Sequence, residues 1–315
     1  MCTAITYSAS DHYFGRNLDY EHSFGEKIVI TPRNFPLPFR YMKTINTHFA
    51  LIGMAVVSEN FPLYFDATNE KGLSMAGLLF SENAFYRPLN KECDNIPSFE
   101  FIPWVLSQCE NVADAKKLIE KINITDDIFS SEFPPSPLHW IIADRKESIT
   151  VEALREGIFV HNNPVGVLTN NPPFPFQMFN LNNYMSLSNN PPENTFSEKI
   201  NLSPYSRGMG AMGLPGDVSS ASRFVRASFT KLNSVSEKDE KSCVNQFFHI
   251  LGSVRQIRGL TLLENGLYEI TQYSSCVNTD KGLYYYTTYD NLSINCVNLY
   301  STDLDESTLT VCTLE

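Results

Sequence analysis

Short runs of β-branched and aromatic residues, broken by turn residues, dominate the chain from Cys2 to Phe80. The runs CTAITY, HYFGR, KIVITPR and FALIGMAVV have the composition of successive strands. The segment YFDATNEKGLSMAGLLF then places an Asn-Glu-Lys-Gly turn signal between two apolar runs, which is typical of a hairpin. This part of the sequence therefore predicts four strands followed by a β-hairpin.

Two later parts of the chain carry apolar residues at the three- and four-residue spacing of helices. Between Ser98 and Ile122, SFEFIPWVLSQC and NVADAKKLIEKI predict a helical hairpin with Ser98 and Asn111 as N-caps. After the Gly/Pro-rich lead-in GMGAMGLPGD, SASRFVRASFTKLNSV and KSCVNQFFHILGSV predict a second helical pair.

The remaining segments return to strand patterns. The Pro-rich stretch SSEFPPSPLHW is predicted to be a loop, and LHWIIADR, SITVEAL, GIFVHN and GVLTN after it predict a second sheet. The end of the chain, with LYEITQYSSC, KGLYYYTTYD and NLSINCVNLY, again predicts strands. Helix layers that cover stacked antiparallel sheets satisfy this order, because each sheet has a face to bury. We therefore predict one α+β domain over residues 1–315.

Composition and charge narrow the range of partners. The hydrophobic fraction of 43% and charged fraction of 19% are ordinary for a folded globular chain. A net charge of -11 without a Lys/Arg cluster argues against binding to nucleic acid. The first twenty residues lack the pattern of a signal peptide, and the longest apolar stretch, near Phe49 to Val57, is too short to span a bilayer. We expect a cytoplasmic protein that does not insert into a membrane.

The seven cysteines are scattered and show neither CxxC nor Cys/His metal spacing, so we predict no metal site and interpret six of them as reduced thiols. Cys2 differs because it follows Met1. Removal of Met1, favoured by a small second residue, would leave a free α-amino group on Cys2. With an ordinary pKa of about 7.7–8.0, that amine could accept the thiol proton near neutral pH. One residue would then supply both nucleophile and base.

An alternative pairs a cysteine with a distant histidine, as in papain-like enzymes. His249 lies on the helical apolar face of FFHIL and His139 in the strand-like LHW, so both suit packed or surface positions better. Near Cys2, the strand FGRNLDY supplies Arg16 and Asp19. The cation could lower the thiol pKa and the carboxylate could orient the amine; otherwise the two would form a surface ion pair.

Across nearly its whole length the sequence resembles the choloylglycine hydrolases, the N-terminal-nucleophile family of conjugated bile salt hydrolases and penicillin V acylases. The resemblance rests on MCTAITY, YFGRNLDY, ITPRNFPL, YFDATNEKGLSMAGL, FEFIPWVLSQC, SPLHWIIAD, NPVGVLTNNP, FNLNNY, SRGMGAMGLPGD, SSASRFVRA and FFHILGSV, in this order. It implies a four-layer αββα sandwich of two antiparallel sheets covered by helices. It also implies an amidohydrolase with a small-molecule substrate, no metal and no cofactor, assembled as a homotetramer.

The resemblance assigns roles to five residues. The family's nucleophile falls on Cys2, its active-site arginine on Arg16 and its amine-binding aspartate on Asp19. Its oxyanion asparagine falls on Asn170, the first of the two asparagines in LTNN, and its second arginine falls on Arg223.

One position departs from the family pattern. Bile salt hydrolases usually have AGLN with an active-site asparagine where this chain has AGLL, ending at Leu79. Leu79 keeps a main-chain N–H for the oxyanion, because only proline lacks one, but loses the polar side chain. Leu18, Phe65, Leu79 and Phe129 are candidates to line an apolar substrate cleft.

The resemblance implies hydrolysis of the amide bond in glycine- or taurine-conjugated bile salts. Two alternatives stay open at this point: a penicillin V acylase with the same chemistry, and a catalytically weakened binding protein on the same fold.

Overall fold

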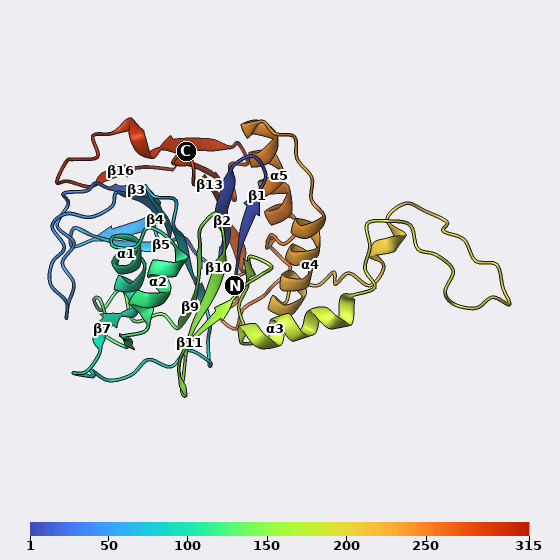
Figure 1. Cartoon of the computed structure of the whole chain (residues 1–315), viewed down its shortest axis with the longest axis horizontal. Coiled ribbons are helices and arrows are strands. Elements are labelled where there is room, and N and C mark those ends of the chain that lie inside the picture. Colours follow the sequence, from blue (N-terminus) through green and yellow to red (C-terminus); the bar gives the residue numbers. More distant parts are fainter. Residues whose placement is uncertain (315) are drawn as a thin grey trace.

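Two stacked antiparallel sheets form the centre of the computed structural model, which describes residues 1–314 (Figure 1). One sheet has six strands, in the order β12 (Val167–Leu168), β1 (Cys2–Ser8), β2 (His12–Tyr20), β13 (Ile270–Asn278), β14 (Leu283–Thr288) and β15 (Asn295–Asn298). The other has eight, in the order β11 (Gly157–Asn162), β10 (Ser148–Leu154), β9 (Leu138–Ala143), β6 (Ser74–Leu79), β5 (Phe61–Asn69), β4 (Leu51–Ser58), β3 (Lys27–Thr31) and β16 (Thr310–Cys312). A small parallel pair joins β7 (Asp94–Pro97) to β8 (Ile122–Thr125).

Helices cover the outer face of each sheet, so the order of layers is αββα (Figure 1). On the eight-stranded sheet lie α1 (Phe101–Leu106), which contacts β5 and β6, and α2 (Val112–Ile119). On the six-stranded sheet lie α4 (Ser220–Asn233) and α5 (Glu240–Gly252), both of which contact β1. The shorter α3 (Phe174–Asn180) packs against α4. Single 3₁₀ turns occur at η1 (Ser98–Glu100), η2 (Leu181–Tyr184), η3 (Met209–Ala211) and η4 (Leu299–Ser301).

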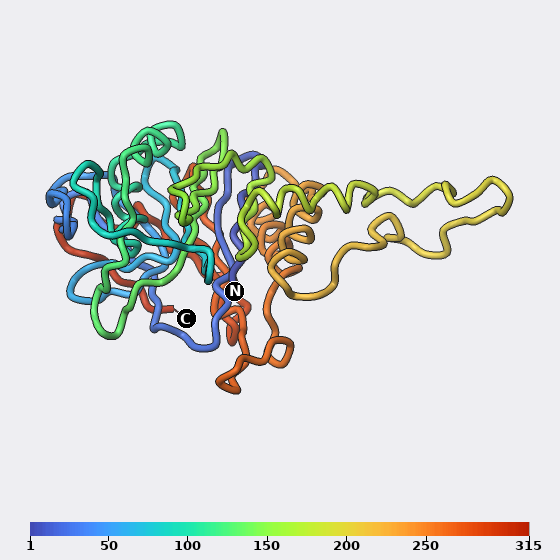
Figure 2. Tube along the Cα trace, turned by 90° about the horizontal axis from the view of Figure 1, so that it is seen from below, coloured from blue at the N-terminus to red at the C-terminus, as the bar shows by residue number. Residues whose placement is uncertain are grey.

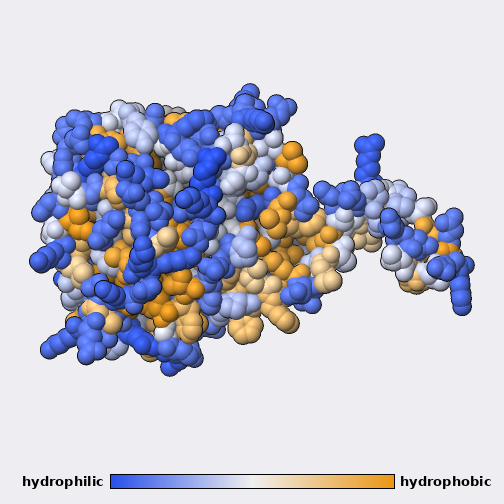
Figure 3. All heavy atoms as spheres, in the orientation of Figure 1, coloured by the Kyte–Doolittle hydropathy of each residue, from blue (hydrophilic) through white to orange (hydrophobic). Residues whose placement is uncertain are grey.

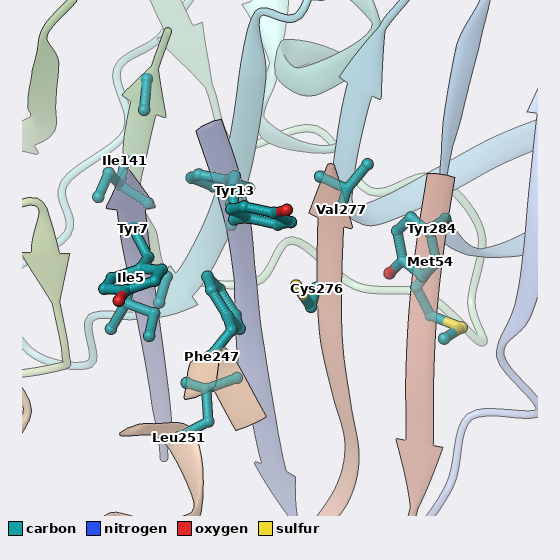
Figure 4. Close-up of a cluster of buried hydrophobic side chains, with 14 of the residues drawn as sticks. Ile5, Tyr7, Tyr13, Met54, Ile141, Phe247, Leu251, Cys276, Val277 and Tyr284 are labelled. Carbon is teal, nitrogen blue, oxygen red and sulfur yellow. The ribbon is translucent and has the colours of Figure 1, made fainter. Parts of the chain in front are cut away.

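The period-two alternation of strands explains why the eight-stranded sheet is apolar on both faces. In β3, Ile28 and Ile30 point into the core between the sheets, and Val29 points into the core under α1 and α2. The outer face of the six-stranded sheet packs against α5. Phe247 and Leu251 of this helix belong to the same cluster of buried residues as the core between the sheets (Figure 4). Each such fully buried aliphatic or aromatic side chain contributes about 1.5–3 kcal/mol.

Most predicted elements are confirmed, including the first four strands, the β5–β6 hairpin and both helical pairs. Asn111 caps α2 as predicted, because its side-chain oxygen accepts from the N–H of Asp114 at 3.0 Å. The prediction for Ser98 is wrong: this residue lies inside η1, where Pro97 is the N-cap and no side-chain cap forms. The helix α1 begins only at Phe101.

The prediction of a separate second sheet after the Pro-rich loop is also wrong. β9 pairs with β6, with Leu78 opposite His139, so β9–β11 extend the sheet that β3–β6 begin. Trp140 and Ile141 are fully buried on opposite faces of β9, which suits a central strand with neighbours on both sides. β12 instead pairs with β1 in the other sheet.

A long segment between η2 and α4, residues 185–219, extends away from the layered body (Figures 1 and 2). We name residues 185–217 the arm. Neither this projection nor α3, β7, β8 and β16 were predicted. Within residues 1–314, no helix has both the length and the apolar character needed to cross a membrane.

Candidate active site

Cys2 lies at the first position of β1, buried between β12 and β2. Antiparallel pairing sets Cys2 opposite Leu18, which places Arg16 and Asp19 on the strand beside it. Met1 continues this pairing: its amino group donates to the carbonyl of Asp19, and its carbonyl accepts from the N–H of Asp19, both at 2.9 Å. The register of one hairpin therefore brings three of the predicted site residues together.

The side chain of Asn170 connects the elements around Cys2. Its Oδ1 accepts from the N–H of Cys2 at 2.7 Å and from Nη2 of Arg223 at 2.8 Å, and its Nδ2 donates to the carbonyl of Leu79 at 2.7 Å. An amide NH₂ has two donors, so one N–H remains for a ligand. The neighbouring Asn171 donates to the carbonyl of Ser81 instead, which agrees with the choice of Asn170.

Arg223 reaches the site from α4 and is fully buried. Its Nη1 donates to the carbonyl of Cys2 and, at 2.7 Å, to Oγ1 of Thr3, while its Nε donates to the carbonyl of Val218 at 2.9 Å. Burial lowers the pKa of this guanidinium, against the opposing charge of Asp19. The side chain thus fixes the first residues of β1 from the helix side.

Arg16 is fully buried on the other side of Cys2. Its Nη1 donates to the carbonyls of Gly77 and, at 3.0 Å, Phe65, so it ties β2 to the opposite sheet. Burial disfavours the charge, but the nearby groups of Cys2, Tyr273 and Asp66 outweigh it and hold its pKa above the ordinary value. Among the described residues, Nη2 has no hydrogen-bond partner. A surface ion pair with Asp19, the alternative from sequence, is wrong because both residues are buried.

Asp19 is a buried carboxyl beside the amino terminus. Its Oδ1 accepts from Oγ1 of Thr271 at 2.6 Å. Burial raises its pKa, against the lowering effects of Arg223 and the terminal ammonium. Glu269, two residues before Thr271, forms an ion pair with the Met1 ammonium and is also buried. Sequence reasoning missed Glu269, because it lies directly before β13 and belongs to none of the family motifs.

A cavity of about 380 Å³ opens beside Cys2. The four predicted lining residues, Leu18, Phe65, Leu79 and Phe129, all lie in its wall. The wall residues that sequence reasoning did not single out come mainly from two loops and η1, and include Tyr20, His22, Phe24, Phe99, Ile102, Glu132 and Phe133. The sequence pattern that could have indicated these wall residues is the clustering of aromatic residues in loops beside strand ends.

Leu79 contributes its main chain to the same wall. The N–H of the next residue, Phe80, donates to the carbonyl of Pro137 at 2.7 Å. Because bonds along an antiparallel ladder alternate, the N–H of Leu79 points away from β9. Its orientation is therefore compatible with the predicted donor role.

The three buried histidines have partners away from Cys2, and Nδ1 of the first, His12, lies 2.8 Å from Oγ of Ser8 at the other end of β1. His48 contacts the carbonyls of Phe35 and Phe49, and His139 contacts Glu152 and the carbonyl of Thr169. These contacts give no support to a papain-like pairing, and His22, which lies in the cavity wall with Cys2, contacts the rings of Tyr20 and Phe24.

A cysteine at the first strand position, within stacked antiparallel sheets between helix layers, defines an amide hydrolase of the N-terminal-nucleophile class. The model of the linear amide C–N hydrolases, choloylglycine hydrolase family, matches residues 2–312, and the chain belongs to this family.

Known proteins resemble the chain over nearly its whole length. The bile salt hydrolase/transferase of Lactiplantibacillus plantarum is 55% identical over 309 residues, which are 98% of this chain and 95% of that protein. A mutant conjugated bile acid hydrolase from Clostridium perfringens superposes with a TM-score of 0.92 at 35% identity, covering 100% and 97% of the two chains. Penicillin V acylase from Agrobacterium tumefaciens has the same fold, with a TM-score of 0.75 at 20% identity over 98% and 90%.

Proposed function

We propose that this protein hydrolyses the amide bond of glycine- or taurine-conjugated bile salts, with Cys2 as nucleophile after removal of Met1. The observation that carries the proposal is the side chain of Asn170, which bonds both Arg223 and the N–H of Cys2, a residue in the wall of the 380 Å³ cavity. A rigid, largely apolar steroid suits a cavity of this size with few polar groups. The relatives named for bile salt hydrolysis support the same substrate class.

In the proposed reaction, the neutral α-amine of Cys2 takes the thiol proton and sulfur attacks the amide carbonyl carbon. The remaining N–H of Asn170 and the N–H of Leu79 stabilise the tetrahedral oxyanion. The amine returns the proton to the leaving nitrogen, and water then hydrolyses the thioester. Burial lowers the pKa of the Met1 ammonium at this place, and the same desolvation favours the neutral amine of a processed Cys2.

The two arginines support the chemistry in different ways. Arg16 holds a buried guanidinium beside Cys2, where its charge can stabilise the negative charge that develops in the transition state. Arg223 instead holds the main chain of Cys2 and the side-chain oxygen of Asn170. We propose that Asp19, joined to Thr271, orients the amine.

The first test is the release of free glycine, taurine and 6-aminopenicillanic acid from conjugated bile salts and penicillin V in parallel. We expect faster turnover of bile salts, and none with Cys2→Ala. Turnover unchanged in Cys2→Ala would refute the nucleophile. Intact mass of the active preparation must show loss of Met1, since a retained methionine leaves no free amine on Cys2.

Two alternatives are less well supported. The likeness to penicillin V acylase lies at 20% identity and carries only the fold. A binding protein without activity would not need the linked set of Cys2, Asn170 and Arg223. Faster turnover of penicillin V, or binding of bile salts without turnover, would favour the first or the second.

We propose acyl transfer as a second activity of the same site, because the 55% identical relative is named hydrolase/transferase. A thioester at Cys2 can react with an amine in place of water. Addition of a free amino acid during turnover should therefore yield its bile acid conjugate, detected by mass. Free bile acid as the sole product at high amine concentration would exclude transfer.

We propose a homotetramer assembled through the arm. Six apolar arm residues expose between 47% and 86% of their surface: Met185, Phe196, Ile200, Leu202, Tyr205 and Met212. Figure 3 shows such hydrophobic residues on the projecting part and where it leaves the body. Exposed apolar groups of this kind mark protein interfaces.

The double variant Phe196→Ser/Tyr205→Ser should lower the mass of the assembly measured by light scattering. Leu292→Ser, which changes an exposed apolar residue outside the arm, is the control. A monomeric wild type would refute the assembly.

We also propose that residues 1–315 form one domain and that the protein is cytoplasmic. Residues of both sheets share one core cluster, which supports a single folding unit. All seven cysteines are free, as expected in a reducing compartment.

A further inference from the structure

Behind Asn170 lies a buried pair of titratable side chains that the proposed mechanism does not use, His139 on β9 and Glu152 on β10. Both are fully buried. The two strands are antiparallel with Trp140 opposite Val151, so His139 and Glu152 are the next pair in this register. His139 Nδ1 lies 3.2 Å from Oε1 of Glu152.

Both ring nitrogens of His139 face acceptors. Nε2 lies 2.8 Å from the carbonyl oxygen of Thr169, while Nδ1 faces the carboxylate of Glu152. Neither a carbonyl nor a carboxylate oxygen can donate, so each hydrogen bond requires a proton on the ring. The ring therefore joins the carboxyl of Glu152 to the carbonyl of Thr169. The ring of Phe80 stacks on it at 4.2 Å and 7°.

Glu152 has a second function in the same place. Its Oε1 also accepts from the main-chain N–H of Phe174 at 2.9 Å, and Nε2 of His161 lies 3.6 Å from its Oε2. Burial alone would raise the pKa of this carboxyl, but the contacts with His139 and His161 lower it to about 2. The carboxylate is thus available as an acceptor over the whole neutral range.

The two main-chain groups that this pair binds, the carbonyl of Thr169 and the N–H of Phe174, lie at the two ends of the loop that carries Asn170. Thr169 precedes Asn170 directly, and its carbonyl belongs to the peptide bond that supplies the Asn170 N–H. Phe174 closes the loop at the start of α3. Ser220 holds the loop from α4, since its Oγ accepts from the N–H of Asn170 at 2.8 Å. Both ends of the 169–174 loop are therefore bonded to one buried pair of side chains.

We propose that the His139–Glu152 pair positions Asn170 for catalysis by fixing both ends of its loop. The inference rests on the proposed function, in which Asn170 bonds the amine of Cys2 and stabilises the oxyanion. A displacement of about 1 Å in such a group can lower the rate about a hundredfold. A pair that served stability alone would leave the turnover of folded molecules unchanged.

Two variants distinguish the effect of the hydrogen bonds on kcat from the effects of charge and of stability. His139→Leu/Glu152→Leu removes the bonds to the loop while leaving no unpaired buried charge, a replacement that proteins often tolerate. Glu152→Gln is the matched control: its amide can donate to Nδ1 of a neutral His139 and still accept from the Phe174 N–H. The loop thus loses both anchors in the double variant and keeps them in Glu152→Gln.

In the double variant we expect kcat to fall about 30- to 100-fold, while KM changes less than about threefold. In Glu152→Gln we expect kcat to fall less than about threefold. The folded fraction is measured by circular dichroism, and kcat is expressed per folded site, so partial unfolding does not obscure the result. A double variant with kcat per site near that of the wild type would overturn the proposal. So would a fall in Glu152→Gln as large as in the double variant. An inactive wild type would instead refute the proposed function.

Discussion

The cavity beside Cys2 has two halves that differ in how their residues are held. The polar half consists of Cys2, Arg16 and Asp19 in the wall, with Asn170 and Arg223 hydrogen-bonded to Cys2 behind it. Directed hydrogen bonds hold these five residues.

The apolar half consists of Leu18, Phe65, Leu79 and Phe129 with their aromatic neighbours. Contacts such as the 5.2 Å between the rings of Phe99 and Phe129 hold it, and these have no strict direction. From this difference we expect the polar half to govern the rate of the chemical step and the apolar half to govern which acyl group binds. Hydrogen bonds fix atoms within tenths of an ångström, whereas apolar packing tolerates changes of shape if volume is kept.

The largest effect on catalysis apart from loss of Cys2 is expected from Asn170→Ala. It removes the proposed oxyanion donor and the acceptor for the Cys2 N–H and Arg223. Removal of one such donor costs about 10²–10³ in kcat, so we expect a fall of that size with little change in KM. Asn171→Ala is the matched control, because its side chain bonds Ser81 outside the site. Equal losses in both variants would show that the loop, rather than the amide, is responsible.

A smaller effect, confined to binding, is expected from Phe129→Ala in the apolar half. Loss of this ring removes buried contact area for a steroid worth about 1.5 kcal/mol, or about tenfold in KM, with kcat nearly unchanged. Phe159→Ala, at an exposed position on β11, is the control for a general loss of phenylalanine. If kcat fell tenfold at constant KM, the division of labour between the two halves would be wrong.

Leu79 lies at the boundary of the two halves, so Leu79→Asn tests where the boundary runs. The variant keeps the main-chain N–H, and we expect kcat within about threefold of the wild type. The polar side chain should change the ratio of rates for glycine and taurine conjugates, measured in competition. A rise in kcat of tenfold or more on both conjugates would show that the side chain, rather than the N–H, is the missing oxyanion donor.

The polar half was predictable from sequence and the apolar half only in part, for a physical reason. Cys2, Arg16, Asp19, Asn170 and Arg223 were assigned through the family resemblance, and the structure brings them together around Cys2. The neighbourhood that gives them geometry, such as the bond from Thr271 to Asp19 across 252 residues of chain, leaves no local pattern.

The errors share that origin. Which sheet β9 joins depends on its partner β6, and a helix start at Phe101 rather than at Ser98 depends on the packing of η1. The many phenylalanines could not be sorted by sequence into core and cavity wall, because burial and wall position favour the same residue type. Two phenylalanines, Phe65 and Phe129, were assigned to the wall, whereas Phe24 and Phe133 were not.

The smallest effect on catalysis is expected from Glu100, a buried carboxyl behind the apolar half. One of its oxygens accepts from the N–H of Arg40 at 2.9 Å, and the other has no partner among the described residues. Burial raises its pKa to about 7, against the lowering contacts with Arg40.

Because this pKa is raised on folding, the native state binds the proton more tightly, and stability is lost as pH rises from about 4.5 through 7. Glu100→Gln has no proton to lose, so its free energy of unfolding should exceed that of the wild type by about 2 kcal/mol at pH 8 and by much less at pH 5. Urea unfolding at the two pH values measures the difference, with kcat expected to stay unchanged. A variant equally stabilised at both pH values would show that the carboxyl is already neutral, or its charge already paired, in the native protein.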